Sequence, residues 1–372
     1  MEEKENRGTE TKIAPEEYWL AGIRKLPGRK KYLLRQQFKN AENVYYIEET
    51  ELSKIQFLTE AERNTILQAK KDRGYAGEYE KMKEKGIRFI PYFSPEYPDK
   101  LREIPDFPYA LYVRGTLPDC NSRKAAVIGA RQCSPYGEKY AVEFARQLAA
   151  GGVEIISGLA RGIDGMGQRG ALMGGGRTYA VLGCGVDICY PREHIGLYVD
   201  ILEQGGGILS ELPPGSPPLP QNFPARNRII SGLSDAVLIM EAREKSGSLI
   251  TADMALEQGR DVYALPGPVN SALSCGCNRL IQQGAGILLS PEALLEEWGI
   301  SGGRKGKMND KNQKVLESTE NLVYSCLGLF PKSVDQLSAE TKLGVKELMR
   351  ILVSLELRGY IREISKNNYV SV

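Results

Sequence analysis

The stretch KAAVIGARQCSPYGEKYAVEFARQLAAGGVEIISGLARGID, residues 124–164, decides the fold. It begins with an apolar run at 125–128, continues with a helical pattern that starts at Ser134-Pro135 and stops at Gly151-Gly152, and reaches a second apolar run at 153–156. Serine before a first-turn proline is a typical helix start. Short apolar runs separated by helices are typical of a parallel sheet that is buried on both faces. The stretch therefore predicts a β-α-β unit.

The same alternation continues along the chain. Further apolar runs occur at 179–182, 236–240, 262–265 and 287–289, and a second clear helical pattern covers 249–258. We therefore predict an α/β fold with a Rossmann-like, doubly wound, mostly parallel sheet. The preceding segment, residues 93–118, is rich in proline and tyrosine and is expected to be a linker that ends in a strand at 110–113.

Both flanks of this core have a different character. The pattern predicts a small helical domain over 13–90, after a polar tail, and a Rossmann-like domain over 91–300 that includes the linker. A charged linker over 301–313 then leads to three helices and a hairpin over 314–372, which is typical of a winged helix. Within the first domain, the turn LPGRKK at 26–31 is similar to a helix-hairpin-helix turn that holds a DNA phosphate, but a short helical turn containing Pro-Gly that serves plain packing is commoner and is the favoured interpretation.

Composition excludes several classes of protein. The 372 residues carry a net charge of +2, so charge alone does not demand an anionic partner. Seven cysteines without a CxxC pair, and the absence of a basic, apolar leader, favour a reducing cytoplasm and no membrane segment. The single histidine, His194, argues against zinc sites and against a Ser-His-Asp triad. We expect no metal and no cofactor.

Glycines and arginines gather in the loops that follow the predicted strands. These loops are 129–131, 157–164 and 183–187, and two later segments, 223–232 and 246–251, begin helices. In open parallel sheets ligands bind beyond the carboxyl ends of the strands. Backbone amides at helix starts and planar guanidinium groups both suit phosphate. The loops therefore predict a phosphate-binding edge.

Other chemistries fit these loops less well. A strict GxGxxG and a GxxxxGK[ST] are both absent, which argues against dinucleotide binding and P-loop hydrolysis. Asp164 and Asp187 are expected to cap helices or hold an arginine, and Ser157 lacks a base, so it is expected to be a phosphate ligand or a cap. Because Arg226 and Arg228 are two residues apart, at most one of them can face a ligand if their segment is helical.

Eight strings occur in order and resemble one known family. They are GARQCSPYG, SGLARGID, LGCGVDICYP, NFPARNRIISGLS, SGSLITA, ALEQGR, LPGP and GCNRLI, and they are similar to those of the DNA-processing protein A family, DprA or Smf. The flanks are also similar to that family, with a sterile-alpha-motif-like (SAM-like) helical domain before the core and a winged helix after it.

The resemblance implies a function and a set of site residues. It implies a non-catalytic, cytoplasmic protein that binds single-stranded DNA, protects it, forms homodimers through the Rossmann-like domain and helps load RecA in natural transformation. It implies that Arg131 and Arg192 are the leading contacts, the second after a Tyr-Pro pair. The expected nucleic-acid-binding residues are Gly129, Ala130, Arg131, Ser157, Gly158, Arg161, Gly162, Arg192, Arg226, Asn227, Ser246 and Gly247.

Two questions stay open on the sequence. SGSLITADMALEQG resembles the PGGxGTxxE signature of lysine-decarboxylase-like phosphoribohydrolases, so a nucleotide hydrolase that uses Glu257 is the alternative, although Glu257 follows Thr251 at a longer spacing than in that signature. The sequence also leaves open whether Tyr136, Tyr190 or Phe223 stacks on bases, which residues form a dimer interface, and what the winged helix contacts.

Overall fold

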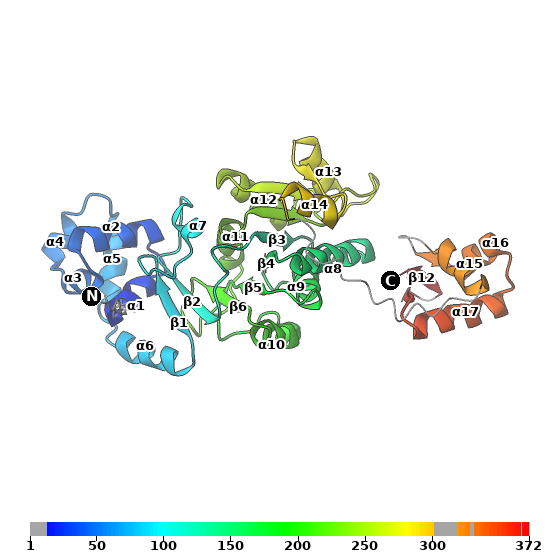
Figure 1. The fold of residues 1–372 in the computed structure, drawn as a ribbon. Coiled ribbons are helices and arrows are strands. Elements are labelled where there is room, and N and C mark those ends of the chain that lie inside the picture. The colour runs from blue at the N-terminus through cyan, green and yellow to red at the C-terminus, as the bar shows by residue number, and fades with distance from the viewer. Residues whose placement is uncertain (1–12, 301–317, 328–330, 366, 372) are drawn as a thin grey trace, which may run out of the picture.

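The computed structural model describes residues 13–300, 318–327, 331–365 and 367–371 (Figure 1). The tail at 1–12 and the linker at 301–313, both predicted from the sequence, lie outside the described residues.

A nine-stranded sheet forms the centre of the molecule, in the order β1-β2-β6-β5-β4-β3-β7-β8-β9. Strands β3 to β9 are parallel to one another, while β2 is antiparallel to β6 and β1 is antiparallel to β2. The predicted mostly parallel sheet is thus confirmed. The strands are β1 (Arg88–Pro91), β2 (Ala110–Gly115), β3 (Lys124–Ile128), β4 (Glu154–Ser157), β5 (Thr178–Val181), β6 (Gly207–Ser210), β7 (Ala236–Ile239), β8 (Asp261–Ala264) and β9 (Gly286–Ile287).

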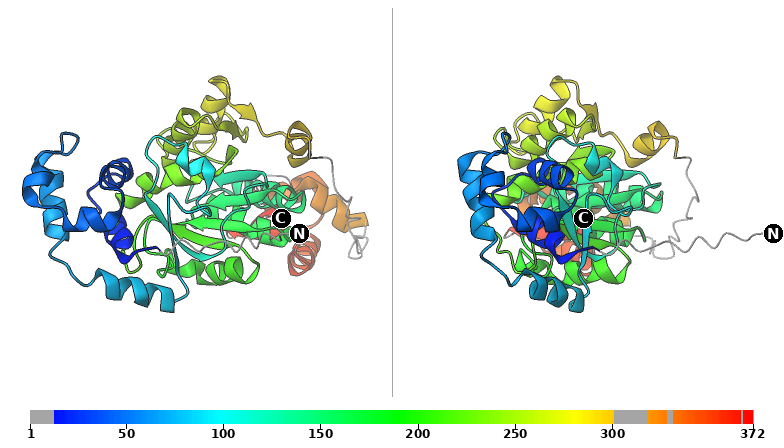
Figure 2. Two further views of the ribbon diagram at one scale, coloured as in Figure 1. Left: turned by 60° about the vertical axis from the view of Figure 1, so that its left-hand side comes forward. Right: turned by 90° about the vertical axis from the view of Figure 1, so that its left-hand side faces the viewer.

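Helices cover both faces of the parallel strands (Figure 2). One face packs against α8 (Pro135–Ala150), α9 (Ile163–Met173) and α14 (Pro291–Glu297) through Phe144, Leu148 and Leu294. The other face packs against α7 (Asp99–Arg102), α11 (Asn222–Leu233), α12 (Gly247–Glu257) and α13 (Cys275–Gln282). This two-sided cover is the predicted doubly wound arrangement.

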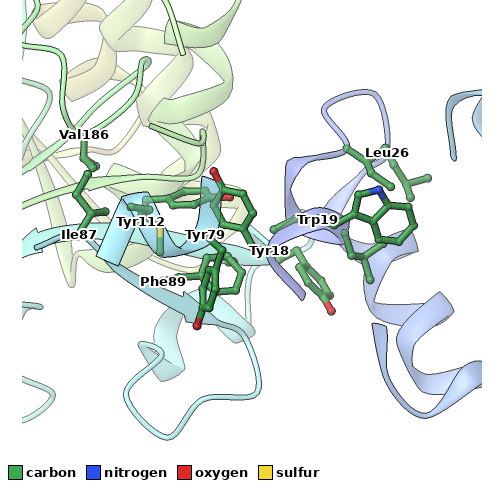
Figure 3. Packing of buried hydrophobic residues seen from close by; sticks show 14 of the residues in the cluster. Tyr18, Trp19, Leu26, Tyr79, Ile87, Phe89, Tyr112 and Val186 are labelled. Atoms are coloured by element: carbon green, nitrogen blue, oxygen red, sulfur yellow. The ribbon is translucent and has the colours of Figure 1, made fainter. Parts of the chain in front are cut away.

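The N-terminal helices share a hydrophobic core with the sheet. They are α1 (Pro15–Gly22), α2 (Gly28–Phe38), α3 (Ala41–Tyr46), α4 (Glu49–Ser53), α5 (Glu60–Ala69) and α6 (Tyr75–Glu84). Figure 3 shows Tyr18 of α1 among Phe89 and Tyr112 of the antiparallel strands, and its ring centroid lies 5.8 Å from each of theirs. The same cluster includes α10 (Ile195–Glu203) and the short turn of helix η1 (Arg192–His194) precedes it. The predicted boundary near residue 90 therefore falls inside β1.

The C-terminal segment forms a winged helix, as predicted. Helices α15 (Ser318–Cys326), α16 (Val334–Thr341) and α17 (Val345–Leu357) pack around Leu337, Leu348 and Leu352, which are fully buried. A three-stranded sheet in the order β10-β12-β11 completes it, with β10 (Lys332–Ser333), β11 (Ile361–Ser365) and β12 (Asn368–Ser371).

Candidate nucleic-acid interface

A cleft of ≈ 510 Å³ lies at the carboxyl ends of the parallel strands, and we call it the switch-point cleft. From β3 the chain builds β4, β5 and β6 on one side and then returns to build β7, β8 and β9 on the other. The strand order therefore reverses between β3 and β7, which is where ligands bind in open α/β sheets. The cleft is lined by the loop after β3, the segment after β5, and the starts of α11 and α12.

The loop after β3 is held rigidly beside the cleft. The Ala130 amide donates to the Glu241 carbonyl at 2.8 Å, and the Ile163 amide donates to the Ala130 carbonyl at 3.2 Å. A Cβ at Gly129 would lie 2.8 Å from the Glu241 carbonyl oxygen, so the loop requires glycine there. Arg131 follows with an exposed side chain that lines the cleft. The backbone is thus fixed while the guanidinium faces solvent.

Glu241 holds this loop in place through the hydrogen bonds of its carboxylate. Only 2% of it is exposed, and its carboxylate accepts the Ser134 amide at 2.8 Å and contacts the Ser134 hydroxyl, which caps α8. Burial raises the pKa of Glu241, while the two bonds from Ser134 oppose that rise. The sequence interpretation missed Glu241. The available signal was a carboxylate directly after the apolar run at 236–240.

Arg226 is a buried part of the cleft floor. It is 5% exposed, and its Nη1 donates to the Gly158 carbonyl at 2.9 Å and contacts the Val181 carbonyl. Burial lowers the pKa of Arg226 to about 10, with the nearby Asp164 opposing, so Arg226 remains charged at neutral pH. Arg226 therefore ties the loop after β4 to the end of β5, and it adds positive charge beneath the cleft.

The loop after β4 is also largely internal. Ser157 is fully buried, and its hydroxyl donates to the Val127 carbonyl at 2.7 Å, so its side chain serves the sheet. The Gly158 amide donates to Asp164 Oδ2 at 3.1 Å, and burial raises the pKa of Asp164 while Arg226 opposes the rise. Gly162 has φ +68°, and a Cβ there would lie 2.3 Å from the Ala130 carbonyl oxygen. These residues position the loops that border the cleft.

Arg161 and Arg192 lie outside the lining of the cleft. Both are exposed, and Arg161 Nη2 pairs with Glu193 Oε2 at 2.7 Å, which joins the loop after β4 to η1. Arg192 forms no ion pair with any other residue that the structure describes. The two arginines border the cleft on the side of η1.

Two of the three aromatic candidates face the cleft. Tyr190 is 43% exposed, and its ring centroid lies 5.5 Å from that of Phe223 with an interplanar angle of 34°. Both rings line the cleft. Tyr136 instead donates its hydroxyl to the Pro266 carbonyl at 2.6 Å. The pair Tyr190 and Phe223 is therefore the available stacking surface.

The start of α12 presents polar groups to the opposite wall. Ser246 caps the helix, its hydroxyl lies 2.7 Å from that of Ser248, and Gly247 is exposed. Lys245, an exposed cation that the sequence interpretation missed, precedes them, and its position before Ser-Gly-Ser was the signal. Glu257 ends the same helix ten residues beyond Gly247, about 15 Å away along the axis. The glutamate of the hydrolase alternative is thus remote from the cleft.

Asn227 and Arg228 leave α11 in different directions. Asn227 lines the cleft. Arg228 Nε donates to Asp106 Oδ2 at 3.0 Å and its Nη2 contacts Glu211, so it pins the linker before β2. Contrary to the expectation from the sequence, Asp187 neither caps a helix nor holds an arginine in the described part of the chain, but accepts the Gly215 amide at 2.7 Å.

The described residues contain no group of three or more His, Cys, Asp or Glu side chains arranged to hold a metal ion. Within the same residues, no helix has the length and apolar character needed to cross a membrane.

Comparison with known proteins identifies the family. The model described as "DNA recombination-mediator protein A" matches residues 88–299, and that described as "DprA winged helix domain" matches 310–365. Protein Smf of Escherichia coli is 43% identical over 281 residues, which cover 74% of this chain and 75% of Smf. DNA processing protein DprA of Streptococcus pneumoniae is 45% identical over 202 residues, covering 54% of this chain and 71% of that protein.

Solved structures agree with these matches. The X-ray structure of DprA from Streptococcus pneumoniae superposes with a TM-score of 0.67 at 33% identity, covering 77% of this chain and 98% of that one. A structure of DprA from Helicobacter pylori, described for its single-stranded DNA binding mode, gives a TM-score of 0.51 at 30% identity and covers 57% of this chain and 95% of that one. The chain belongs to the DNA recombination-mediator protein A family.

Proposed function

We propose that this protein binds single-stranded DNA in the switch-point cleft, without cutting it, as the DNA-binding step of a recombination mediator. The observation that carries the proposal is the position of Arg131. An exposed guanidinium on a rigid loop lies beside a half-exposed aromatic pair at the strand-order switch. Single-strand binding without sequence preference needs this combination of cations for phosphates and rings for bases.

In this proposal each wall of the cleft has a separate role in DNA binding. Arg131 and Lys245 contact phosphates from opposite sides, and the amides at the start of α12 add donors between them. Tyr190 and Phe223 stack on bases. Asn227 and the Ser246 hydroxyl donate further hydrogen bonds.

The remaining expected residues act around this centre. Gly129, Ala130, Gly158 and Gly162 shape the loops, and Ser157 and Arg226 hold those loops from inside. Arg161 and Arg192 extend the cationic border toward η1 and guide the strand away from the cleft. We propose no catalytic group, because the buried Asp164 and Glu241 already accept bonds from the backbone.

Three finer features belong to the same proposal. The protein helps load RecA, as the family description of a recombination mediator supports. It forms a homodimer through the Rossmann-like domain, and it works in the cytoplasm, which its odd set of unpaired cysteines supports. We also propose that the chain divides into a helical domain that begins at residue 13 and ends before β1, a Rossmann-like domain that includes β1 and extends to residue 300, a linker at 301–313 and a winged helix at 314–372.

A binding assay and a cleavage assay on the same sample test the proposal. The intact chain is mixed at low salt with labelled oligo-dT and analysed by mobility shift, and the recovered oligonucleotide is then sized on a denaturing gel. We expect a retarded complex and full-length DNA. Absence of a complex, or shortened DNA that depends on the protein, would contradict the proposal.

A further inference from the structure

A second cavity, of ≈ 250 Å³, lies beyond the carboxyl end of β6, and we call it the turn pocket. Its walls are the turn between α1 and α2, the segment before β2, and residues 211–213 after β6. The charged residues in these walls are Arg24, Lys25, Lys31, Arg228, Asp106 and Glu211. The pocket therefore lies where the N-terminal helices meet the sheet.

Lys31 is the unusual member of this group. It is 7% exposed, and its Nζ donates to the Ala21 carbonyl at 2.6 Å. It forms no ion pair in the described part of the chain. An ammonium group has three protons to donate, and burial of a charge without a counter-ion is costly. Lys31 is thus a buried cation without an ion-pair partner among the described residues, and the carboxylates of Asp106 and Glu211 lie in the same pocket.

The two carboxylates of the pocket are already engaged. Arg228 pairs with Asp106 at 3.0 Å and contacts Glu211. Arg24 and Lys25 are exposed, and Arg24 Nη2 donates to the Ser216 hydroxyl at 2.8 Å. Four cations against two paired carboxylates leave an excess of positive charge around the cavity.

The LPGRKK turn, residues 26–31, places the main chain at the start of α2 beside the turn pocket. Helix α2 begins at Gly28 and has no side-chain cap, so the start of an 11-residue helix adds its partial positive charge. A Cβ at Gly28 would lie 2.1 Å from the Phe107 carbonyl oxygen, so only glycine allows this turn to approach the segment before β2. The close approach brings the start of α2 against the segment before β2, and both of these line the pocket.

From this arrangement we infer that the turn pocket binds a terminal phosphate group, either as inorganic phosphate or as the phosphate at the end of a nucleic-acid strand. A terminal phosphate enters a pocket enclosed by three segments, whereas a phosphate within a strand needs a groove that is open at both ends. Charge-assisted bonds from ammonium and guanidinium groups are the strongest that a phosphate receives.

The inference that the phosphate comes from the end of a nucleic-acid strand rests on the proposed function. The fold supports this inference. One loop separates the two sites, because Pro213 lines the turn pocket while Pro218 and Pro220 line the switch-point cleft. Both sites also lie at the carboxyl edge of the sheet. A strand that leaves the cleft across this loop would bring its end to the turn pocket.

Equilibrium dialysis with radiolabelled orthophosphate on the full chain tests the inference. We expect saturable binding at one site per chain, weakened about tenfold or more by Lys31→Met. Lys30→Met is the matched control, because Lys30 neighbours Lys31, pairs with Glu62 at 2.6 Å and does not line the pocket. Arg131→Glu is the second control, since it disables the cleft only. Both controls should bind phosphate as the unchanged protein does.

Several results would overturn the inference. They are absence of saturable binding, equal binding by Lys31→Met, or loss of binding in Arg131→Glu alone, which would place the phosphate in the cleft. If Lys31→Met does not fold, Arg24→Gln, which changes an exposed residue at the pocket, must weaken phosphate binding in its place. These results do not depend on oligonucleotide binding, so failure here and failure of the proposed function are distinguishable.

Oligonucleotides then separate the two sources of phosphate. Short oligo-dT with and without a terminal phosphate, at either end, is titrated into the unchanged protein and into Lys31→Met. If one phosphorylated oligonucleotide binds more tightly than the form without phosphate, and Lys31→Met abolishes this difference in affinity, the pocket binds the phosphate at a strand end. Equal binding of all forms, beside saturable orthophosphate binding, assigns it to the free ion.

Discussion

The guanidinium carbon of Arg131 lies 5.5 Å from the centroid of the Phe223 ring. The arginine comes from the loop after β3 and the ring from the first turn of α11, so the contact joins the two sides of the strand-order switch. A cation over a ring face is held in position while its outer edge remains available. One residue pair thus presents a phosphate contact beside a stacking surface.

Replacement of Phe223 by leucine tests the stacking surface. Phe223→Leu should weaken oligo-dT binding by about 1–3 kcal/mol, because base stacking on an aromatic side chain contributes about that much per base. Fluorescence anisotropy with labelled oligo-dT measures the change. Tyr136→Phe is the control, since the Tyr136 hydroxyl bonds to Pro266 rather than facing the cleft, and it should leave affinity unchanged. Unchanged affinity in Phe223→Leu would remove the ring from the site.

Replacement of Arg226 should destabilise the protein rather than only weaken binding. Arg226→Met leaves the Gly158 and Val181 carbonyls without their donor and Asp164 without its neighbouring charge. Removal of one partner from a buried charged group costs about 3–5 kcal/mol. Urea denaturation measures the free energy of unfolding. Arg131→Ala, at an exposed position, should stay within about 0.5 kcal/mol of the unchanged protein. A stable Arg226→Met that binds no DNA would instead make Arg226 a direct contact.

Arg226 also shows where sequence reasoning ends. The loops at strand ends were predictable, because every parallel strand delivers its carboxyl end to one edge, and Arg131, Asn227, Ser246 and Gly247 do line one cleft. The direction of a side chain on α11 depends on how that helix rotates against the sheet, which is decided by tertiary packing. The spacing of Arg226 and Arg228 predicted that the two side chains would point in different directions. It did not predict that Arg226 would face the interior and that Arg228 would face the linker before β2.

Prediction of the fold from the sequence has a similar limit. The β-α-β stretch at 124–164 has long, regular signals, and its elements occur where they were expected. Strand β6 was missed, because only Ile208 and Leu209 are apolar in a stretch that follows three glycines. Strand β1 was missed because it is four residues long and ends in a proline, as edge strands can. The shared core of the N-terminal helices and the sheet depends on contacts between Tyr18 and Tyr112, which no local pattern contains.

The pH dependence of stability tests the burial of Lys31. Burial lowers the pKa of Lys31 to about 8 from its ordinary value of 10.5, with Glu211 and Asp106 opposing and Arg228 assisting. Below pH 8 the folded protein therefore carries the cost of a buried ammonium, and the unfolded chain does not. Between about pH 8 and pH 10.5 the unfolded chain binds the proton more strongly, so this group raises the free energy of unfolding as pH rises.

Lys31→Met provides the comparison. At pH 7, without phosphate, this variant should be more stable than the unchanged protein by about 1–3 kcal/mol, and the difference should shrink above pH 8. Urea denaturation at a series of pH values measures both proteins, and subtraction cancels the tyrosines that titrate in the same range. A difference that does not change between pH 7 and pH 10 would show that Lys31 is not desolvated.

Replacement of Glu257 tests the distance between this residue and the cleft. Glu257→Gln should bind oligo-dT with the affinity of the unchanged protein, because Glu257 is exposed and ends α12 away from the cleft. Incubation of both proteins with nucleoside monophosphates, followed by chromatography, should show no free base in either sample. Base release that Glu257→Gln abolishes would support the hydrolase alternative.

The salt dependence of single-strand binding, measured by anisotropy for the unchanged protein and for Arg131→Glu, tests the central claim most directly. The logarithm of the association constant should fall linearly with the logarithm of salt concentration, by about 0.7 per phosphate contacted. Arg131→Glu should remain folded, bind at least about tenfold more weakly, and show a shallower slope. Salt-independent binding, or a folded Arg131→Glu with unchanged affinity and slope, would contradict a phosphate grip in the switch-point cleft.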